Sequence, residues 1–417
     1  MKRILFLFGI LLASLSVHAD EGMWILKELN QQSAARMQEL GFKFPIDSIY
    51  SEENPSLKDA VVIFGRGCTG VAVSKDGLIF TNHHCGYDAI QQHSSVEHDY
   101  LKDGFISKTR EDELYTPELT IAFLRKTEDV TAQVTAGVLS SHSEKERTQI
   151  IDSLSTEILN QYKILTTDSA ALASGAKKVY KDNDFVRARI VPFYEGNKYY
   201  LVVYDIFQDI RMVLAPPSSI GKFGGDTDNW MWPRQTGDFS VFRVYANKDN
   251  QPAKHSDDNV PYKPKYSIPV SLKGYEKGDY AMTVGYPGVT DRYLSSWGVT
   301  QLMEAENKPR IEVRGVKQDI WKEAMDKSDE VRIKYASKFS RSSNYWKNSI
   351  GMNKALTRLK VIDGKRKVEA DFAQWLAKNP EKQEKYGNTL QLLDSAYAHN
   401  LDESRAATYF LEVFNRG

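Results

Sequence analysis

The sequence predicts an α+β protein, and three observations support this. Short β-rich apolar runs fill residues 60 to 284 of the 417-residue chain, whereas residues 298–417 are rich in Lys, Glu, Ala, Leu and Arg. In that second stretch apolar residues recur three and four positions apart, which is the spacing of one helix face. Hydrophobic residues make up 41%, and 55 basic residues balance 55 acidic ones. A core of useful size is therefore expected, with no overall charge that would attract nucleic acid or an anionic membrane.

Residues 1–19 have the pattern of a secretory signal peptide. Lys2 and Arg3 precede an apolar run at residues 4–15, and Val17-His18-Ala19 forms a small-x-small site before Asp20. The run is short for a membrane span, so a retained anchor is the weaker alternative, and no later segment is apolar for long enough. We expect a mature chain that starts near Asp20 and is exported to the periplasm or the outer cell surface.

Local patterns predict individual elements along the mature chain. Asp76-Gly77 is a hairpin turn between two apolar runs, and Gly41 follows a run with helical spacing. The expected helices cover residues 23–40 and 143–162. The expected strands cover residues 61–64, 70–73, 78–81, 185–193, 198–207, 239–245, 268–272 and 280–284. In the helical part, breaks are expected at Asn379-Pro380 and at residues 386–388.

The chain has two cysteines, Cys68 and Cys85, and they bracket the predicted hairpin. In an oxidising compartment such a pair is best interpreted as a disulfide. Closing a loop of this size would stabilise the fold by roughly 3 kcal/mol in the chain-entropy model. A free reactive thiol beside His84 is the weaker alternative, because a partner lies so close in sequence.

A histidine pair follows the hairpin directly, in Phe80-Thr81-Asn82-His83-His84-Cys85-Gly86. Histidine suits a general base because its ordinary pKa lies near neutral pH. The stretch resembles the histidine motif of chymotrypsin-like serine peptidases, in which a Cys follows the catalytic His, and by that match His84 is the base. A zinc site is an alternative, although a fourth ligand at recognisable spacing is absent. Another alternative is that both histidines are ordinary residues of a surface loop.

A second segment, residues 223–239, holds three Asp, two Trp and three Gly and ends in Asp238 before a predicted strand. A carboxylate at the base of a strand can hold a histidine in one tautomer. This segment, the His-His-Cys stretch and Asp20-Glu21-Gly22-Met23-Trp24 together resemble the bacterial dipeptidyl-peptidases of the 7 and 11 type. The resemblance covers essentially the whole mature chain.

The resemblance implies a chymotrypsin-like double β-barrel with an inserted α-helical domain. Residues 20–297 would be the N-terminal part of the peptidase domain, with the second barrel largely missing, and residues 298–417 an incomplete helical domain. His84 matches the catalytic base and Asp238 its orienting carboxylate. Asn229, Trp230 and Asn344 match positions that bind the free N-terminus of an oligopeptide substrate; a capping Asn and a core Trp are the plainer alternatives. Serine acyl transfer implies no cofactor and no metal. A homodimer is possible.

The nucleophile is the point at which the sequence departs from the family pattern. The family carries its Ser in a Gly-Asn-Ser-Gly-like segment after the helical domain, and the chain has no such segment. Ser174, in Ala173-Ser174-Gly175, is the nearest look-alike, in a helical context. We therefore expect a fragment of a dipeptidyl-peptidase that is inactive alone. A non-catalytic peptide-binding protein is the alternative, whereas the helical region and Asn229-Trp230 count against an ordinary endopeptidase. The reading frame beyond the codon for Gly417 would discriminate between the first two.

Overall fold

The computed structural model describes residues 23–29, 31–166, 179–194, 196–289, 291 and 293–415. The predicted signal peptide and Ser174 lie outside these residues. The chain forms two compact units, of which the smaller comprises residues up to Lys58 together with Lys273–Met282. The larger comprises Asp59–Leu272 and the chain from Thr283 onward. It contains the candidate functional residues.

The smaller unit has short helical segments where one helix over residues 23–40 was predicted. A 3₁₀ turn, η1 (Leu26–Glu28), precedes helix α2 (Gln31–Glu39), and η2 (Ile46–Ser48) follows. The chain leaves α2 at Gly41, as predicted, and the Phe42 amide donates to the Met37 carbonyl at 2.9 Å. Phe42 then packs against Tyr280 of the same unit, with ring centroids 5.2 Å apart.

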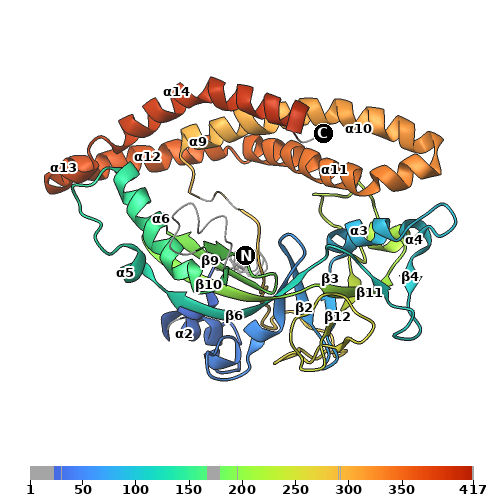
Figure 1. Ribbon diagram of the computed structural model, residues 1–417. Coiled ribbons are helices and arrows are strands. Elements are labelled where there is room, and N and C mark those ends of the chain that lie inside the picture. The colour runs from blue at the N-terminus through green and yellow to red at the C-terminus, as the bar shows by residue number, and fades with distance from the viewer. Residues whose placement is uncertain are drawn as a thin grey trace, which may run out of the picture. The chain divides into compact units, whose positions relative to one another are not determined.

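The larger unit is built on an antiparallel sheet (Figure 1). Within the described residues its strand order is β4-β11-β12-β3-β2-β1-β6-β10-β9, with β13 paired to β12 and β5 to β11, while β7 and β8 form a separate pair. The strands are β1 (Val61–Phe64), β2 (Cys68–Ala72), β3 (Leu78–Thr81), β4 (Phe105–Ile106), β5 (Leu114–Tyr115), β6 (Ile121–Asp129), β7 (Ile164–Thr166), β8 (Val179–Lys181), β9 (Val186–Phe193), β10 (Lys198–Phe207), β11 (Asp209–Ala215), β12 (Ser240–Ala246) and β13 (Val260–Pro261).

The two predicted hairpins are present. Strands β2 and β3 pair across the Asp76-Gly77 turn, with Val71 opposite Phe80, and β9 pairs with β10 over its whole length. Alternate residues of the first hairpin face a core in which Ile79 and Phe242 are fully buried. That core fixes the register of β3 against its neighbours, because a one-residue slip would turn every apolar side chain to the other face.

Two of the predicted strands are wrong. Residues 268–272 run without a ladder partner among the described residues; the Ile268 amide donates one bond to the Ala72 carbonyl, and Leu272 is 96% exposed. Residues 280–284 also form no strand. Both segments have the apolar, β-branched composition of a strand, but a strand exists only when a neighbouring edge accepts its backbone hydrogen bonds.

Helices account for most of the chain after Ser295, as the composition indicates, and breaks fall after Lys378 and Tyr386 where they were predicted. The remaining helical segments are η3 (Leu57–Asp59), α3 (His83–Gln92), α4 (Tyr100–Asp103), α5 (Thr131–Val134), α6 (Glu144–Asn160), α8 (Ser218–Gly221), α9 (Ser296–Gln301), the π-helical η4 (Leu302–Asn307), α10 (Lys308–Lys327), α11 (Asp329–Arg358), α12 (Val361–Lys378), η5 (Pro380–Lys382), α13 (Gln383–Tyr386), α14 (Thr389–Phe410) and the π-helical η6 (Leu411–Asn415). Helix α6 matches the helix predicted at 143–162 and begins with a capping box between Ser143 and Glu146.

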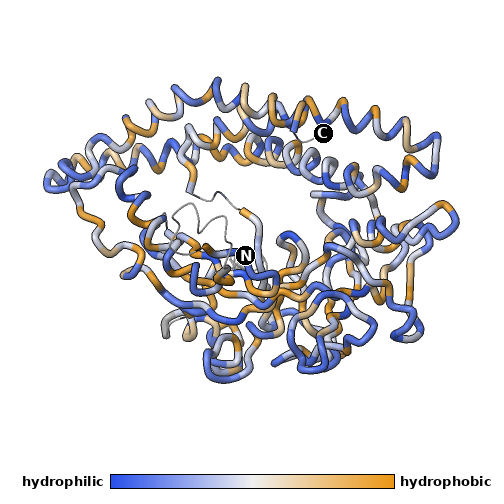
Figure 2. The backbone as a smooth tube through the Cα atoms, viewed as in Figure 1, coloured by the Kyte–Doolittle hydropathy of each residue, from blue (hydrophilic) through white to orange (hydrophobic). Residues whose placement is uncertain are grey.

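The long helices carry both polar and apolar residues. Figure 2 shows the two kinds interspersed along α10, α11, α12 and α14. A buried ion pair joins two of the segments, since Arg314 of α10 donates to Glu412 of η6 from Nε at 2.7 Å and from Nη2 at 3.1 Å. Among the described residues, none of the helices is both long enough and apolar enough for a membrane span. The domain boundary at residue 298 stays a prediction.

Candidate active site

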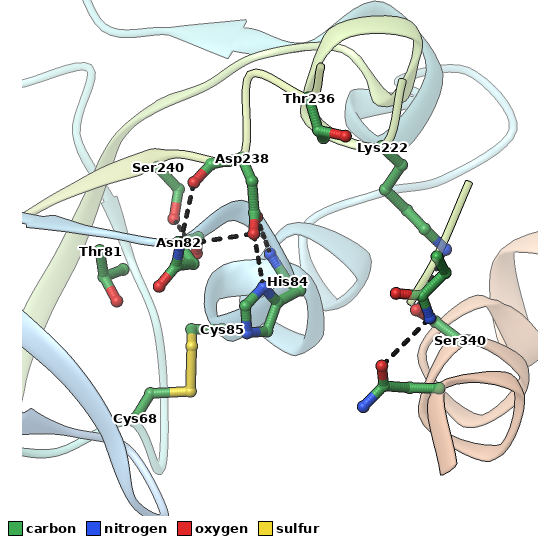
Figure 3. Close-up of polar contacts among 12 residues, drawn as sticks. Cys68, Thr81, Asn82, His84, Cys85, Lys222, Thr236, Asp238, Ser240 and Ser340 are labelled. Carbon is green, nitrogen blue, oxygen red and sulfur yellow. Dashed lines mark hydrogen bonds and ion pairs between the residues drawn. A yellow bond between two sulfur atoms is a disulfide. The ribbon is translucent and has the colours of Figure 1, made fainter. Parts of the chain in front are cut away.

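The histidine pair follows the hairpin directly, as predicted, and lies on the first turn of helix α3. Asn82 is the residue between strand β3 and this helix, and its carbonyl accepts hydrogen bonds from the amides of Cys85 and Gly86. The predicted disulfide is confirmed: Cys68 and Cys85 are bonded, with their Cα atoms 6.1 Å apart (Figure 3). The bridge ties strand β2 to the first turn of α3, directly beside His84.

His84 and Asp238 lie in contact although 154 positions separate them in sequence. The ring Nδ1 of His84 is 2.7 Å from Oδ2 of Asp238, and the His84 backbone amide donates to Oδ1 at 3.0 Å. The predicted contact is therefore present, and it uses the ring nitrogen nearer the backbone. A carboxylate at Nδ1 holds the ring so that Nε2 is available to exchange a proton. The His84 side chain is 61% exposed, so that nitrogen is accessible from solvent.

Strand pairing explains this contact. Strand β12 lies antiparallel to β3, with Ser240 opposite Thr81, so the residue before β12 lies beside the residues after β3. Asp238 lies two residues before Ser240, the first residue of β12, and so lies just outside the strand. Close packing reinforces the arrangement: a Cβ on Gly86 would lie 2.6 Å from the Ser240 hydroxyl oxygen, so only glycine fits there. The Ser240 hydroxyl donates to the Asn82 carbonyl at 2.9 Å (Figure 3).

The Asp238 carboxylate is partly buried and ionised. Burial, the largest effect, favours the neutral acid, but the hydrogen bonds and charge of His84 together outweigh it and hold the Asp238 pKa below its ordinary value of 3.8. Asn82 adds a weaker contact from Nδ2 to Oδ2 at 3.4 Å. Asp238 therefore carries its negative charge at neutral pH, as a carboxylate that stabilises an imidazolium must.

His83, in contrast, is fully buried. Its ring meets Tyr87 edge-on at 5.4 Å and lies so close to Gly221 that a Cβ there would be 2.4 Å from two ring atoms. Neither ring nitrogen has a well-aligned hydrogen-bond partner among the described residues. Burial is the main cause that lowers the His83 pKa to about 4, although the Pro216 carbonyl and Asp238 act in the opposite direction. His83 is thus a neutral packing residue, and His84 is the histidine of the pair that contacts Asp238.

The three predicted substrate-binding residues lie together. Asn229 Nδ2 donates to Asn344 Oδ1 at 3.1 Å, and Trp230 Nε1 donates to the same oxygen at 3.0 Å. Arg234 in turn donates to Asn229 Oδ1 at 3.1 Å. The cluster joins the 223–238 segment to helix α11. Its polar oxygens and the half-exposed Trp230 ring offer acceptors and an aromatic face to a cation. The binding role itself stays a prediction.

Lys222 is a residue of this region that the sequence did not indicate, because it immediately precedes the conspicuous segment. Its ammonium donates to Ser340 of α11 at 3.0 Å (Figure 3), and it lies 4.9 Å from the centre of the Tyr87 ring. Burial, the largest effect, lowers the Lys222 pKa, with Asp226 acting against it. No pattern in the sequence marks such a lysine, since its partners are distant in the chain.

The zinc alternative does not fit the geometry. Cys68, His84 and Cys85 place their ligand atoms within 4.8 Å of one another, but both sulfurs are consumed in the disulfide and cannot act as thiolate ligands. Among the described residues, His84 is hydrogen-bonded to Asp238 through both its ring Nδ1 and its backbone amide. The structure thus contains a histidine and a carboxylate in the geometry expected of a general base and its orienting group.

An exposed histidine held by a carboxylate through Nδ1 is the arrangement of hydrolases that activate a nucleophile by general base catalysis. Comparison with known families gives the particular case: the chain belongs to the Peptidase S46 family, whose model matches residues 19–417.

Relatives within this family are close in sequence. The chain is 53% identical to dipeptidyl-peptidase 7 of Porphyromonas gingivalis over 418 residues, which cover 100% of the chain and 56% of that protein. It is 40% identical to the Asp/Glu-specific dipeptidyl-peptidase of the same organism, with the same coverage. The crystal structure of Porphyromonas endodontalis DPP11 in complex with the dipeptide Arg-Glu matches with a TM-score of 0.84 at 39% identity, covering 96% of this chain and 55% of that one. The chain thus spans about half the length of the relatives it matches.

Proposed function

We propose that the protein carrying this sequence releases dipeptides from the free N-termini of oligopeptides by serine-type catalysis. The observation that carries the proposal is the contact of 2.7 Å between His84 Nδ1 and Asp238, with Nε2 open to solvent. The named relatives, which include dipeptidyl-peptidase 7 and Asp/Glu-specific dipeptidyl-peptidases, support the same reaction.

In the proposed mechanism His84 is the general base. Its Nε2 removes the proton from a serine hydroxyl as the oxygen attacks the scissile carbonyl, and then returns that proton to the leaving amine. Asp238 keeps Nδ1 protonated and stabilises the imidazolium. A water molecule, activated by the same nitrogen, hydrolyses the acyl-enzyme and restores the serine. We propose that the serine belongs to sequence that the longer relatives have and this chain does not match.

The cluster of Asn229, Trp230 and Asn344 is proposed to bind the substrate's N-terminal ammonium. An ammonium donates three hydrogen bonds; Asn344 Oδ1 already accepts two within the cluster, whereas Asn229 Oδ1 accepts one from Arg234 and keeps a lone pair for the ammonium. Trp230 adds an aromatic face that is 55% exposed. The solved relatives from Porphyromonas endodontalis were crystallised with the dipeptides Arg-Glu and Arg-Asp, which is consistent with a site for short peptides.

The detailed fold type and the location of the protein, which the family resemblance implies, are proposed on the same basis. The antiparallel sheet would be the first barrel of a chymotrypsin-like fold, and the helices after Ser295 its inserted domain. Export to the periplasm or the outer surface is proposed from the signal-peptide pattern, and the disulfide is of a kind that persists in oxidising compartments.

The test compares the full-length protein that carries this sequence with residues 20–417 alone. Release of a chromophore from dipeptidyl substrates with free N-termini, but not from N-blocked ones, is expected of the full-length protein only. His84→Ala should abolish it, and residues 20–417 alone should be inactive. Dipeptide binding without turnover in the full-length protein would instead identify a peptide-binding protein. Turnover by residues 20–417 that depends on His84 would place the nucleophile within them.

A further inference from the structure

One face of helix α3 connects the candidate base to the candidate amine site. His84, Asp88 and Gln91 are spaced i, i+4 and i+7, so their side chains share that face. His84 contacts Asp238, as described above. The other two residues contact α11, the helix that carries Asn344.

The Gln91 amide makes two hydrogen bonds to the backbone of α11. Its Oε1 accepts from the Ser337 amide at 2.7 Å, and its Nε2 donates to the Lys334 carbonyl at 3.1 Å. Asp88 accepts from the Ser337 hydroxyl and from Arg341 Nη2, which is 3.2 Å from both carboxylate oxygens. Donors and acceptors alternate, so this contact specifies one relative placement of the two helices.

Further bonds follow the same side of α11 toward Asn344. Ser340 accepts from Lys222 at 3.0 Å (Figure 3). Asn344 follows and is bonded to Asn229 and Trp230. Successive contacts at positions 337, 340/341 and 344 are three or four residues apart, as neighbours on one helix face are.

We propose that Gln91 and Asp88 are positioning residues that hold the amine-binding Asn344 at a fixed distance from His84. This inference rests on the proposed function, and it assigns the residues that set where the scissile bond falls. It makes the contact between α3 and α11 a specificity determinant for dipeptide release.

The geometry explains why this contact should be sensitive. Gln91 lies seven residues after His84, and Asn344 lies seven residues after Ser337. Each of these two helical segments is thus about 10 Å long, at 1.5 Å per residue, and the segments meet where Gln91 contacts Ser337. A change of about 6° in the angle between them would displace Asn344 by about 1 Å relative to His84. A misplacement of about 1 Å between bound substrate and catalytic groups can cost about a hundredfold in rate.

The ion pair within this contact contributes little to stability. Asp88 and Arg341 are 65% and 57% exposed, and exposed ion pairs typically contribute less than about 1 kcal/mol. A positioning role therefore predicts a change in turnover without a matching change in melting temperature, which a merely structural role would not produce.

The experiment uses the full-length protein with Gln91→Ala, Asp88→Ala and the charge exchange Asp88→Arg with Arg341→Asp. Glu330→Gln is the matched control, because it breaks an exposed ion pair with Lys334 on the same helix without touching α3. Kinetics on dipeptidyl and tripeptidyl substrates are compared with melting temperatures.

We expect Gln91→Ala and Asp88→Ala to lower kcat at least tenfold on dipeptidyl substrates while KM stays within about threefold, since the amine site is intact. The share of tripeptide release should rise, the charge exchange should recover part of the Asp88→Ala loss, and Glu330→Gln should behave as wild type. Unchanged kcat in both single variants would overturn the inference, and so would a loss that only follows the melting temperature.

A failure of the proposed function would be recognised separately, as a wild-type protein without dipeptide release. In that case hydrogen exchange of α11 tests the positioning contact independently of catalysis. Loss of protection over residues 332–344 in Gln91→Ala, but not in Glu330→Gln, would retain the positioning contact, whereas equal protection in both variants would overturn it.

Discussion

Replacing Cys68 and Cys85 together by serine should destabilise the sheet and the start of α3 by about 3 kcal/mol. The bridge closes a loop with a sequence separation of 17. In the chain-entropy model a loop of about 17 residues removes about 10 cal/mol/K from the unfolded state, which is about 3 kcal/mol at 25 °C. The equilibrium between the folded and locally unfolded states should therefore shift roughly a hundredfold.

The assay is native-state hydrogen exchange on peptides that cover β2 and α3, because exchange reports the free energy of opening for each region. The double variant should lose about 3 kcal/mol there, and peptides from α14 should be much less affected. Reductant should produce the same loss in the wild type and no change in the double variant. A loss below about 1 kcal/mol would refute the reasoning, since the bridge would then add little constraint to the unfolded chain.

Three further predictions concern charges. In the full-length protein Asp238→Asn should lower kcat by about 10⁴ with little change in KM, measured on dipeptidyl substrates, because the amide no longer holds His84 in the right tautomer; a loss below tenfold would contradict this role. The Asp238 pKa is lowered on folding, so its ionised form stabilises the fold above the ordinary pKa of 3.8, and that contribution disappears as the pH falls through the folded pKa. Acid unfolding should therefore show wild type and Asp238→Asn differing at pH 6 and converging near pH 2. Arg314→Met should cost about 3–5 kcal/mol in urea unfolding of the helical region, because it leaves Glu412 buried without its main partner; replacing both by apolar residues should recover most of the loss.

The features that the sequence predicted well are local. A hairpin at Asp76-Gly77, a helix beginning near residue 143 and helix breaks after residues 378 and 386 all depend on a few neighbouring residues. The disulfide belongs with them, because the hairpin itself brings Cys68 near Cys85. The predicted contact between His84 and Asp238 is present, and the histidine pair lies on a helix that directly follows the hairpin.

The features that the sequence missed depend on distant partners. Residues 268–272 have a strand-like composition but find no partner edge among the described residues, since composition does not reveal which edges are already occupied. Lys222 carries no recognisable pattern, because its contacts to Tyr87 and Ser340 join segments more than a hundred positions apart.

Residue types and short spacings therefore determined the candidate chemistry of this chain: a histidine beside a disulfide, a carboxylate before a strand and an Asn-Trp pair. Only the tertiary structure decided how these groups act together. Pairing of β12 with β3 brings Asp238 to Nδ1 of His84, and packing of α11 on α3 brings Asn344 to Trp230. The physical reason is that a hydrogen bond forms within a few ångströms in space, and the strand pairing and helix packing that supply that proximity are properties of the folded chain, not of any short segment.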